Sequence, residues 1–226
     1  MIVERNDDYV VIDDLLDPDS LARLHDFVKR EKYFFENGFE WNKVWHPLEG
    51  QALVTGPRCY GDTDRPGARY PTDTPLDLFF EAMKEHFDLI ADLTAQDASE
   101  IKYVLSAYLY RAGWGLPWHD DRGNDDGYRG AFAYYLHEEW RGNWGGELMI
   151  LREPRQAEAD ERSIDLGFRQ GAGFSQPTSV RRGIGEFILP KRNRLVMMRH
   201  ALLHAVKPVS PLAGENMRFS LAGFFL

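Results

Sequence analysis

The feature that most constrains the fold is a series of short apolar runs between residue 100 and the last residue of the chain. Turn-forming residues separate the runs, and each run has the length of one β-strand. They cover residues 101–110, 131–136, 147–151, 186–189, 194–199, 204–209 and 217–225. Many short strands at modest spacing predict a mostly β fold, built as a sandwich or a barrel.

The N-terminal part of the chain shows helical signals. A short apolar strand is predicted at residues 9–12, and Asp17 followed by Pro18 predicts a helix start, because an N-cap carboxylate precedes proline at the first helical position. A second helix is predicted from Pro75 to about Leu93 by apolar residues at helical spacing. We expect both helices to flank the strands. The sequence of residues 41–70 does not allow an assignment to helix or strand.

Composition and length indicate one globular domain. The chain has 226 residues, of which 43% are hydrophobic, and its single cysteine, Cys59, excludes an internal disulfide. We expect a single domain over residues 1–226, with helical support at about 1–98 and a strand core at about 99–226.

The net charge bears on partners and location. With 27 basic and 36 acidic side chains the formal charge is −9, and such a surface repels phosphate backbones and anionic lipids. We therefore expect neither nucleic acid nor a membrane as partner. The first eight residues lack the basic start and apolar run of a signal peptide, so a cytoplasmic location is predicted.

Two histidines and a carboxylate form a candidate metal site. His119 and Asp121 follow a predicted strand, and we expect them on a loop at the rim, where residues i and i+2 of an extended backbone point the same way. His204 opens a later strand. Two histidines and one carboxylate form the face that leaves open positions on ferrous iron. The alternative for His119 and Asp121 is a hydrogen-bonded surface pair.

An arginine inside the last apolar run is a candidate anion site. Arg218 and Ser220 point to the same face of this predicted strand. Burying an arginine without an anion is costly, and a bound dicarboxylate would supply a bidentate partner with the serine hydroxyl as a second donor. The alternative is a structural salt bridge to a carboxylate of the core.

Together these segments resemble the iron(II)- and 2-oxoglutarate-dependent oxygenases, in particular their prolyl-hydroxylase-like branch. The resemblance covers most of the chain, in the family's order. It is carried by residues 9–16 (YVVIDDLL), 110–113 (YRAG), 144–148 (WGGEL), 193–198 (NRLVMM), 204–209 (HAVKPV) and 218–221 (RFSL). The resemblance implies a double-stranded β-helix, that is, a jelly-roll or cupin-like barrel, with iron bound by His119, Asp121 and His204.

The resemblance also implies a co-substrate pocket. Arg218 would bind the distal carboxylate of 2-oxoglutarate with help from Ser220. Tyr110, together with Tyr108 on the same strand face, would donate hydrogen bonds from the side. The implied cofactors are Fe(II), 2-oxoglutarate and O2, with ascorbate as a candidate reductant.

Departures from individual branches narrow the expected activity. Prolyl hydroxylases commonly use lysine at a shorter offset, whereas Arg218 lies fourteen residues after His204. Phe224 stands where the nucleic-acid demethylating branch carries a second arginine, and Asp121 retains the ligand that halogenating enzymes lack. We therefore expect hydroxylation, or a related oxidation, of an unactivated C–H bond.

The expected substrate is a small molecule, such as an amino acid or a specialised metabolite, with release of succinate and CO2. Two alternatives remain open at this point. One is a non-catalytic β-barrel binding module, and the other is a metal-dependent cupin-type enzyme that does not use 2-oxoglutarate. Five tryptophans are candidates for the wall of a substrate pocket: Trp41, Trp45, Trp114, Trp118 and Trp144.

A charged, glycine-containing segment interrupts the series of strands. Residues 152–185 show no sustained periodicity and join two predicted strands. Long loops in compact domains are usually functional or disordered. We predict that this segment is a mobile lid over the iron.

Overall fold

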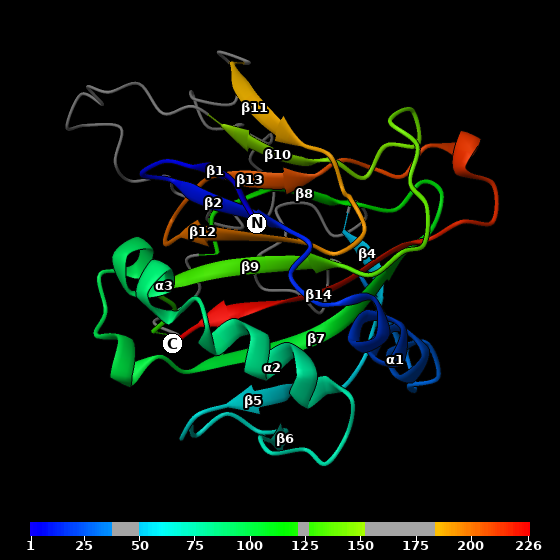
Figure 1. Cartoon of the computed structure of the whole chain (residues 1–226). Coiled ribbons are helices and arrows are strands. Elements are labelled where there is room, and N and C mark those ends of the chain that lie inside the picture. The colour runs from blue at the N-terminus through cyan, green and yellow to red at the C-terminus, as the bar shows by residue number, and fades with distance from the viewer. Residues whose placement is uncertain (38–49, 122–126, 152–183) are drawn as a thin grey trace, which may run out of the picture.

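Two β-sheets lie one above the other in the computed structural model, and helices cover the outer face of the larger sheet (Figure 1). The structure describes residues 1–37, 50–121, 127–151 and 184–226. Within these ranges every strand pair is antiparallel except the short β5–β6 pair. The predicted mostly β fold is confirmed.

The larger sheet has ten strands. Their order across the sheet is β1 (Ile2–Arg5), β2 (Tyr9–Asp13), β12 (Arg194–Arg199), β9 (Gly130–Tyr135), β14 (Arg218–Phe225), β7 (Tyr103–Tyr110), β4 (Gln51–Val54) and β3 (Phe34–Asn37). Two further strands extend from β7, namely β5 (Arg58–Tyr60) and β6 (Ala68–Arg69). The sheet thus combines strands from both halves of the chain.

The smaller sheet has four strands and faces the larger one. Their order is β11 (Gly185–Ile188), β10 (Leu148–Leu151), β13 (His204–Val206) and β8 (Leu116–His119). Among the described residues no strand pairing joins the two sheets into a closed barrel. The arrangement is therefore an open jelly-roll sandwich.

The central strands of the larger sheet are buried on both faces, and alternate residues serve two different cores. On β14, Phe219 and Leu221 belong to the outer core under the helices, whereas Ala222 and Phe224 pack against the inner core between the sheets. A period of two explains this division, because successive side chains of a strand point to opposite faces. The inner face is therefore the one that can present side chains to a site between the sheets.

Three α-helices cover the outer face: α1 (Pro18–Lys29), α2 (Leu76–Lys84) and α3 (Phe87–Thr94). The predicted start of α1 is confirmed, because the Asp17 carboxylate accepts hydrogen bonds from the backbone N–H groups of Asp19 and Ser20, both at 3.0 Å. The prediction of one continuous second helix is wrong. His86 leaves the helical region of backbone angles and separates α2 from α3, although both still bury their apolar stripes in the outer core.

The structure corrects two further predictions. Residues 116–119 form strand β8 instead of a rim loop, and Pro117 is tolerated because β8 lies at the edge of its sheet. Within residues 41–70, which received no regular structure, the described part contains β4, β5 and β6. Short 3-10 helices at Ala98–Glu100 and Pro211–Ala213 complete the elements.

Part of the predicted lid lies outside the described residues, which resume at Ile184, and Gly185 is already the first residue of β11. Trp41 and Trp45 also lie outside the described residues. Of the helices described, none is long and apolar enough to span a lipid bilayer.

Candidate metal centre and co-substrate pocket

The two candidate histidines are direct neighbours across two strands. His119 ends β8 and His204 begins β13, and the register of these antiparallel strands places the two residues opposite each other. Their ring centroids are 4.2 Å apart. Both side chains are buried, at 4% and 6% exposure, so the pairing of β8 with β13 fixes one half of the site.

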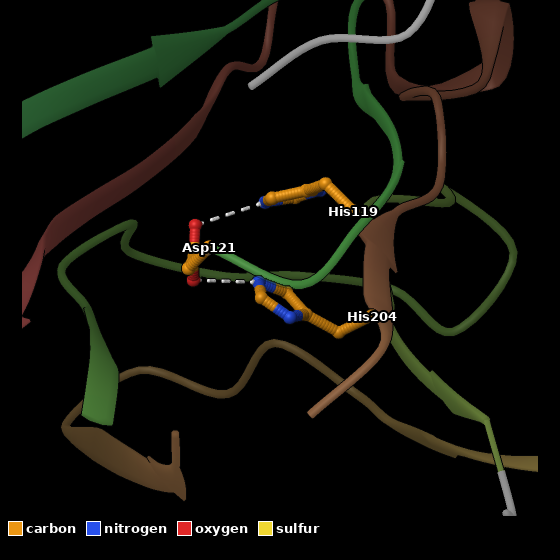
Figure 2. A group of neighbouring side chains, drawn as sticks. All are labelled: His119, Asp121 and His204. Carbon is orange, nitrogen blue, oxygen red and sulfur yellow. Dashed lines mark ion pairs between the residues drawn. The ribbon is translucent and has the colours of Figure 1, made fainter. Parts of the chain in front are cut away.

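Asp121 reaches the histidines through a turn. His119 and Asp121 do lie together as expected, but the expected extended backbone is wrong, because Asp121 has a φ of 57°. This left-handed conformation, which aspartate adopts more readily than most residues, turns the carboxylate back toward both rings. Its Oδ1 lies 3.5 Å from His119 Nε2, and its Oδ2 lies 3.4 Å from His204 Nε2 (Figure 2).

The hydrogen bonds of the two histidines fit the binding of a metal ion. His119 Nδ1 donates to the Pro117 carbonyl at 2.7 Å, and His204 Nδ1 donates to the Leu202 carbonyl at 2.8 Å. Because a carbonyl only accepts, Nδ1 carries the hydrogen in each ring, and a neutral ring keeps its lone pair on Nε2. One ligand atom from each histidine and one from Asp121 lie within 4.8 Å of one another. A divalent cation among these lone pairs would attract all three donors.

A small hollow adjoins this cluster. It is lined in part by Asp121 and His204, with Tyr128, Met198 and His200 on its other sides. Further lining residues are Asp120, Gly130, Ala131, Arg199, Ala201 and Leu202.

Arg218 lies on the inner face of the larger sheet and is 2% exposed. Its Nε donates to the Gly146 carbonyl at 2.8 Å, and its guanidinium stacks over the rings of Tyr110 and Tyr135 at 5.2 and 4.9 Å. Within the part of the chain that the structure describes, it makes no ion pair with a carboxylate. The predicted alternative of a structural salt bridge is therefore not found among these residues.

Gly146 makes room for this arginine. Its φ is +74°, and a Cβ at this position would lie 2.9 Å from Arg218 Cδ and 3.3 Å from Trp140 Cζ2. A larger residue would thus push the arginine stem away from its place. Gly146 both accepts the Arg218 hydrogen bond and leaves the space that the side chain occupies.

Hydroxyl groups surround the guanidinium. The register of β14 with β7 sets Arg218 opposite Tyr110 and Ser220 opposite Tyr108, while β9 places Tyr135 on the other side of Ser220. Arg218 Nη1 donates to Ser220 Oγ at 3.3 Å, and Nη2 donates to the Tyr135 hydroxyl at 3.4 Å. The four predicted pocket residues therefore share one face of the adjacent strands β14 and β7, and Tyr135 on β9 joins them.

The tyrosines of this pocket remain hydrogen-bond donors at neutral pH. Burial raises the pKa of Tyr110 to about 12, although the Arg218 charge acts in the opposite direction. Burial also raises the pKa of Tyr108. Protonated phenols next to a buried cation favour an anionic ligand with several acceptor atoms.

Two residues of the pocket were missed by the sequence reasoning, Tyr135 and Gly146. Gly146 stands in the quoted segment 144–148, but the clash of a Cβ with Arg218 depends on contact between distant segments. Of the described tryptophans, Trp114 and Trp144 are buried in one apolar cluster near Tyr110, and Trp118 is half-buried on β8.

The comparison with known families agrees with this geometry. The family model of the 2OG-Fe(II) oxygenase superfamily matches residues 103–226, which is more than half of the chain. The chain belongs to the 2OG-Fe(II) oxygenase superfamily. None of the curated proteins compared matches it by sequence.

Several solved structures have the same fold at low sequence identity. A Pseudomonas putida prolyl-4-hydroxylase is 16% identical, with a TM-score of 0.60 over 96% of this chain and 91% of that one. A Trichoplax adhaerens prolyl hydroxylase, solved with a hypoxia inducible factor peptide fragment, is 15% identical with a TM-score of 0.58 (98% and 84% covered). AviO1 from Streptomyces viridochromogenes is 19% identical with a TM-score of 0.53 (98% and 90% covered).

Membership in this superfamily settles the class of chemistry. The protein is an Fe(II)- and 2-oxoglutarate-dependent oxygenase, and its cofactors are Fe(II), 2-oxoglutarate and O2. The described residues contain one group of histidines and carboxylates that could hold the iron, namely His119, Asp121 and His204.

Proposed function

We propose that this oxygenase hydroxylates an unactivated C–H bond of a small molecule, such as an amino acid or a specialised metabolite, and releases succinate and CO2. The observation that carries the proposal is the pairing of a three-residue donor cluster with a buried arginine that has no carboxylate partner among the described residues. One feature suits a divalent metal, and the other suits a dicarboxylate co-substrate.

In this proposal His119, Asp121 and His204 hold the iron. When bound with 2-oxoglutarate and O2, the iron supplies the oxidising chemistry that converts a C–H bond to an alcohol. The protein contributes two carbonyl-anchored imidazoles and a carboxylate held by the backbone turn at Asp121. These contacts orient the donor atoms before the metal binds, which reduces the cost of assembling the site.

Arg218 in turn binds the distal carboxylate of 2-oxoglutarate, with the Ser220 hydroxyl beside it. Tyr110 and Tyr108 lie on the neighbouring strand in matching register and provide further donors. Burial of this pocket excludes water, so that a bidentate pair between guanidinium and carboxylate is stronger than it would be in solvent.

Two observations bear on the substrate. Arg218 lies fourteen residues after His204, whereas prolyl hydroxylases commonly use lysine at a shorter offset, and this departure favours a substrate other than a prolyl peptide. The fold similarity to prolyl hydroxylases makes a proline-containing peptide the second candidate.

We also propose that residues 1–226 form a single domain. The helices of the N-terminal part and strands β7, β9, β12 and β14 of the C-terminal part share one outer core. Removal of either part would expose this shared apolar surface.

The function is tested by binding and turnover together. We expect His204→Ala to lose Mn²⁺ binding, measured by electron paramagnetic resonance, and to form no succinate with iron. Arg218→Ala should keep Mn²⁺ binding but lose affinity for 2-oxoglutarate. His200→Ala is the matched control, because His200 is an exposed histidine on the same hollow and should retain Mn²⁺ binding.

A succinate assay with small-molecule and peptide panels then addresses the substrate. Succinate formation that rises with a free amino acid or metabolite supports the proposal, whereas a response only to proline-containing peptides contradicts it. Unchanged Mn²⁺ binding in His204→Ala would contradict the proposed iron ligands, and unchanged 2-oxoglutarate affinity in Arg218→Ala would contradict the proposed anion site.

A further inference from the structure

His137 lies next to Arg218 and has no role in the proposal above. It follows β9, where Tyr135 lies opposite Ser220 and the Leu136 N–H donates to the Phe219 carbonyl at 2.8 Å, so we infer that His137 continues this register beside Arg218. The side chain is 5% exposed, and its ring lies 5.8 Å from that of Tyr135 and 4.9 Å from that of Trp140. It is thus a buried wall of the pocket that contains the guanidinium.

The two ring nitrogens of His137 are unequally satisfied. Nε2 donates to the Pro190 carbonyl at 3.3 Å. Nδ1 is buried and makes no hydrogen bond within the described part of the chain. A neutral imidazole carries one hydrogen, so with Nε2 as donor the Nδ1 atom is an acceptor without a donor. A buried acceptor without a donor lowers the free energy of unfolding. We therefore expect a ligand in this pocket to change the hydrogen bonding of Nδ1.

The charges around the ring keep it neutral in the ligand-free protein. Burial, together with the charges of Arg218 on β14 and Arg192 in the turn before β12, lowers the pKa of His137 to about 3. The carbonyls of Pro190 and Phe219 act in the opposite direction. The phenol of Tyr135, at the end of β9, also contacts His137, and the two ring centroids are 5.8 Å apart.

A carboxylate bound at Arg218 would change the balance at this ring. Its negative charge would offset that of Arg218, the second cause of the lowered pKa after burial. An opposite charge within about 4–6 Å favours the charged form of a titratable group. With one proton taken up from solvent, Nδ1 becomes a donor for which the bound carboxylate is the acceptor, while Nε2 keeps its bond to the Pro190 carbonyl.

We propose that His137 is a proton-coupled member of the co-substrate pocket, which becomes an imidazolium when the carboxylate of 2-oxoglutarate binds at Arg218. This inference rests on the proposed role of Arg218. It assigns the pocket a second cation that exists only while the anion is present. The free pocket thereby avoids two uncompensated buried charges side by side.

The test is calorimetric titration of the Mn²⁺-loaded protein with 2-oxoglutarate in two buffers of different ionisation enthalpy. We expect proton uptake that grows toward one proton per binding event as the pH is lowered from 7.5 to 5.5. Linkage then predicts an affinity that rises by up to about tenfold per pH unit over the range in which uptake is complete.

Two variants provide the comparison. His137→Phe keeps a ring in the pocket and should abolish the proton uptake. His25→Gln is the matched control, because His25 is equally buried, at 6% exposure, and contacts Phe219 from the outer core at 5.9 Å. It should leave the uptake unchanged. A histidine-labelled sample gives a second readout, since the His137 ring resonances of the native protein should shift to imidazolium values on adding 2-oxoglutarate.

The outcomes separate this inference from the proposed function. If native protein binds 2-oxoglutarate through Arg218 without proton uptake, or if His137→Phe takes up as many protons as native protein, the role of His137 is refuted and that of Arg218 stands. If Arg218→Ala binds 2-oxoglutarate as tightly as native protein, the proposed pocket itself is wrong.

Discussion

At the scale of single residues, the candidate site contains buried polar groups that have no oppositely charged partner among the described residues. The Arg218 guanidinium is held by a backbone carbonyl and two hydroxyls, none of which carries a charge. These bonds engage three of its five N–H groups and do not neutralise its charge. In the proposed pocket the residue is therefore oriented before an anion binds, and this preorganisation reduces the entropy lost on binding.

The fork geometry of this arginine leads to a first prediction. Arg218→Lys should weaken 2-oxoglutarate binding about as severely as Arg218→Met, by about a hundredfold, because a point charge cannot reproduce a bidentate pair worth a few kcal/mol. Mn²⁺ affinity should stay at the native value in both variants. Calorimetry of the Mn²⁺-loaded proteins measures this, and native-like affinity in Arg218→Lys would show that charge alone suffices.

A second prediction concerns the glycine that accommodates the arginine. Gly146→Ala should reduce 2-oxoglutarate affinity by about tenfold or more, because an added Cβ 2.9 Å from Arg218 Cδ displaces the side chain, at a cost of about 1–3 kcal/mol. Gly214→Ala is the control, since Gly214 also has a positive φ but open space around its Cβ position. Equal losses in both variants would point to backbone strain instead of contact with the arginine.

The sequence was informative at this scale where chemistry limits the residue type. Residues with the chemistry to bind a metal or an anion, such as His119, His204 and Arg218, stand out in short motifs, and the structure brings the two histidines together. Tyr135 was missed because its contact with Arg218 depends on the pairing of β9 with β14. The reason that Asp121 reaches the histidines was also missed, because a positive φ at aspartate leaves no mark in the sequence.

At the scale of elements, the positions of strands in the sequence were predicted better than the pairing of strands in the sheets. The runs at 194–199 and 101–110 correspond closely to β12 and β7, since apolar β-branched and aromatic stretches bounded by turns have few other readings. β8 was missed because Pro117 is unusual in a strand, and only its edge position permits it. The break between α2 and α3 was missed because neither Glu85 nor His86 is a strong helix breaker.

One asparagine joins the elements of the N-terminal part to the larger sheet. Asn193 precedes β12 with a φ of 62°, and its buried side chain bonds to both the backbone N–H and the carbonyl of Leu16, at 3.0 and 2.7 Å. Its Oδ1 also accepts a bond from the Tyr134 hydroxyl at 2.6 Å. A short polar side chain that tolerates positive φ meets all of these requirements.

This junction gives a third prediction. Asn193→Ala should lower the free energy of unfolding by about 3–5 kcal/mol, because it leaves several buried polar groups without partners and places alanine at positive φ. Asn216→Ala, which removes one part-buried bond to the Ala213 carbonyl, should cost about 1 kcal/mol or less. Urea unfolding followed by circular dichroism compares the two, and similar midpoints would refute the role of Asn193 as a junction.

At the scale of the whole molecule, an acidic protein still places individual carboxylates against cations. Asp13 at the end of β2 is 6% exposed and pairs with Arg194 and Lys191, both at 2.6 Å. Burial alone would raise the pKa of Asp13, but the hydrogen bonds and charges of Arg194 and Lys191 outweigh it and hold the pKa below the ordinary value of 3.8. These pairs connect β2 with β12 and the turn before it.

The fourth prediction is that protonation of Asp13 lowers the free energy of unfolding in acid. A carboxylate with a lowered folded-state pKa contributes stability above its unfolded pKa of about 4, and the contribution is lost as the pH falls through the folded value. Asp13→Asn should therefore be less stable than native protein at pH 7, with a difference that shrinks below pH 4. Urea midpoints at pH 7, 4 and 3 measure it, and a constant difference would exclude Asp13 as the source.

The two-sided burial of β14 has a consequence for how such a protein can change. Inward residues such as Arg218 and Ser220 line the proposed co-substrate pocket, whereas outward residues such as Phe219 and Leu221 pack in the core under the helices. Substitutions that change the pocket and substitutions that change stability therefore fall on alternate residues of β14. Selection can change the inward residues while the outward residues supply the stability that offsets destabilising substitutions. Directed evolution toward new substrates should begin by strengthening the outward set.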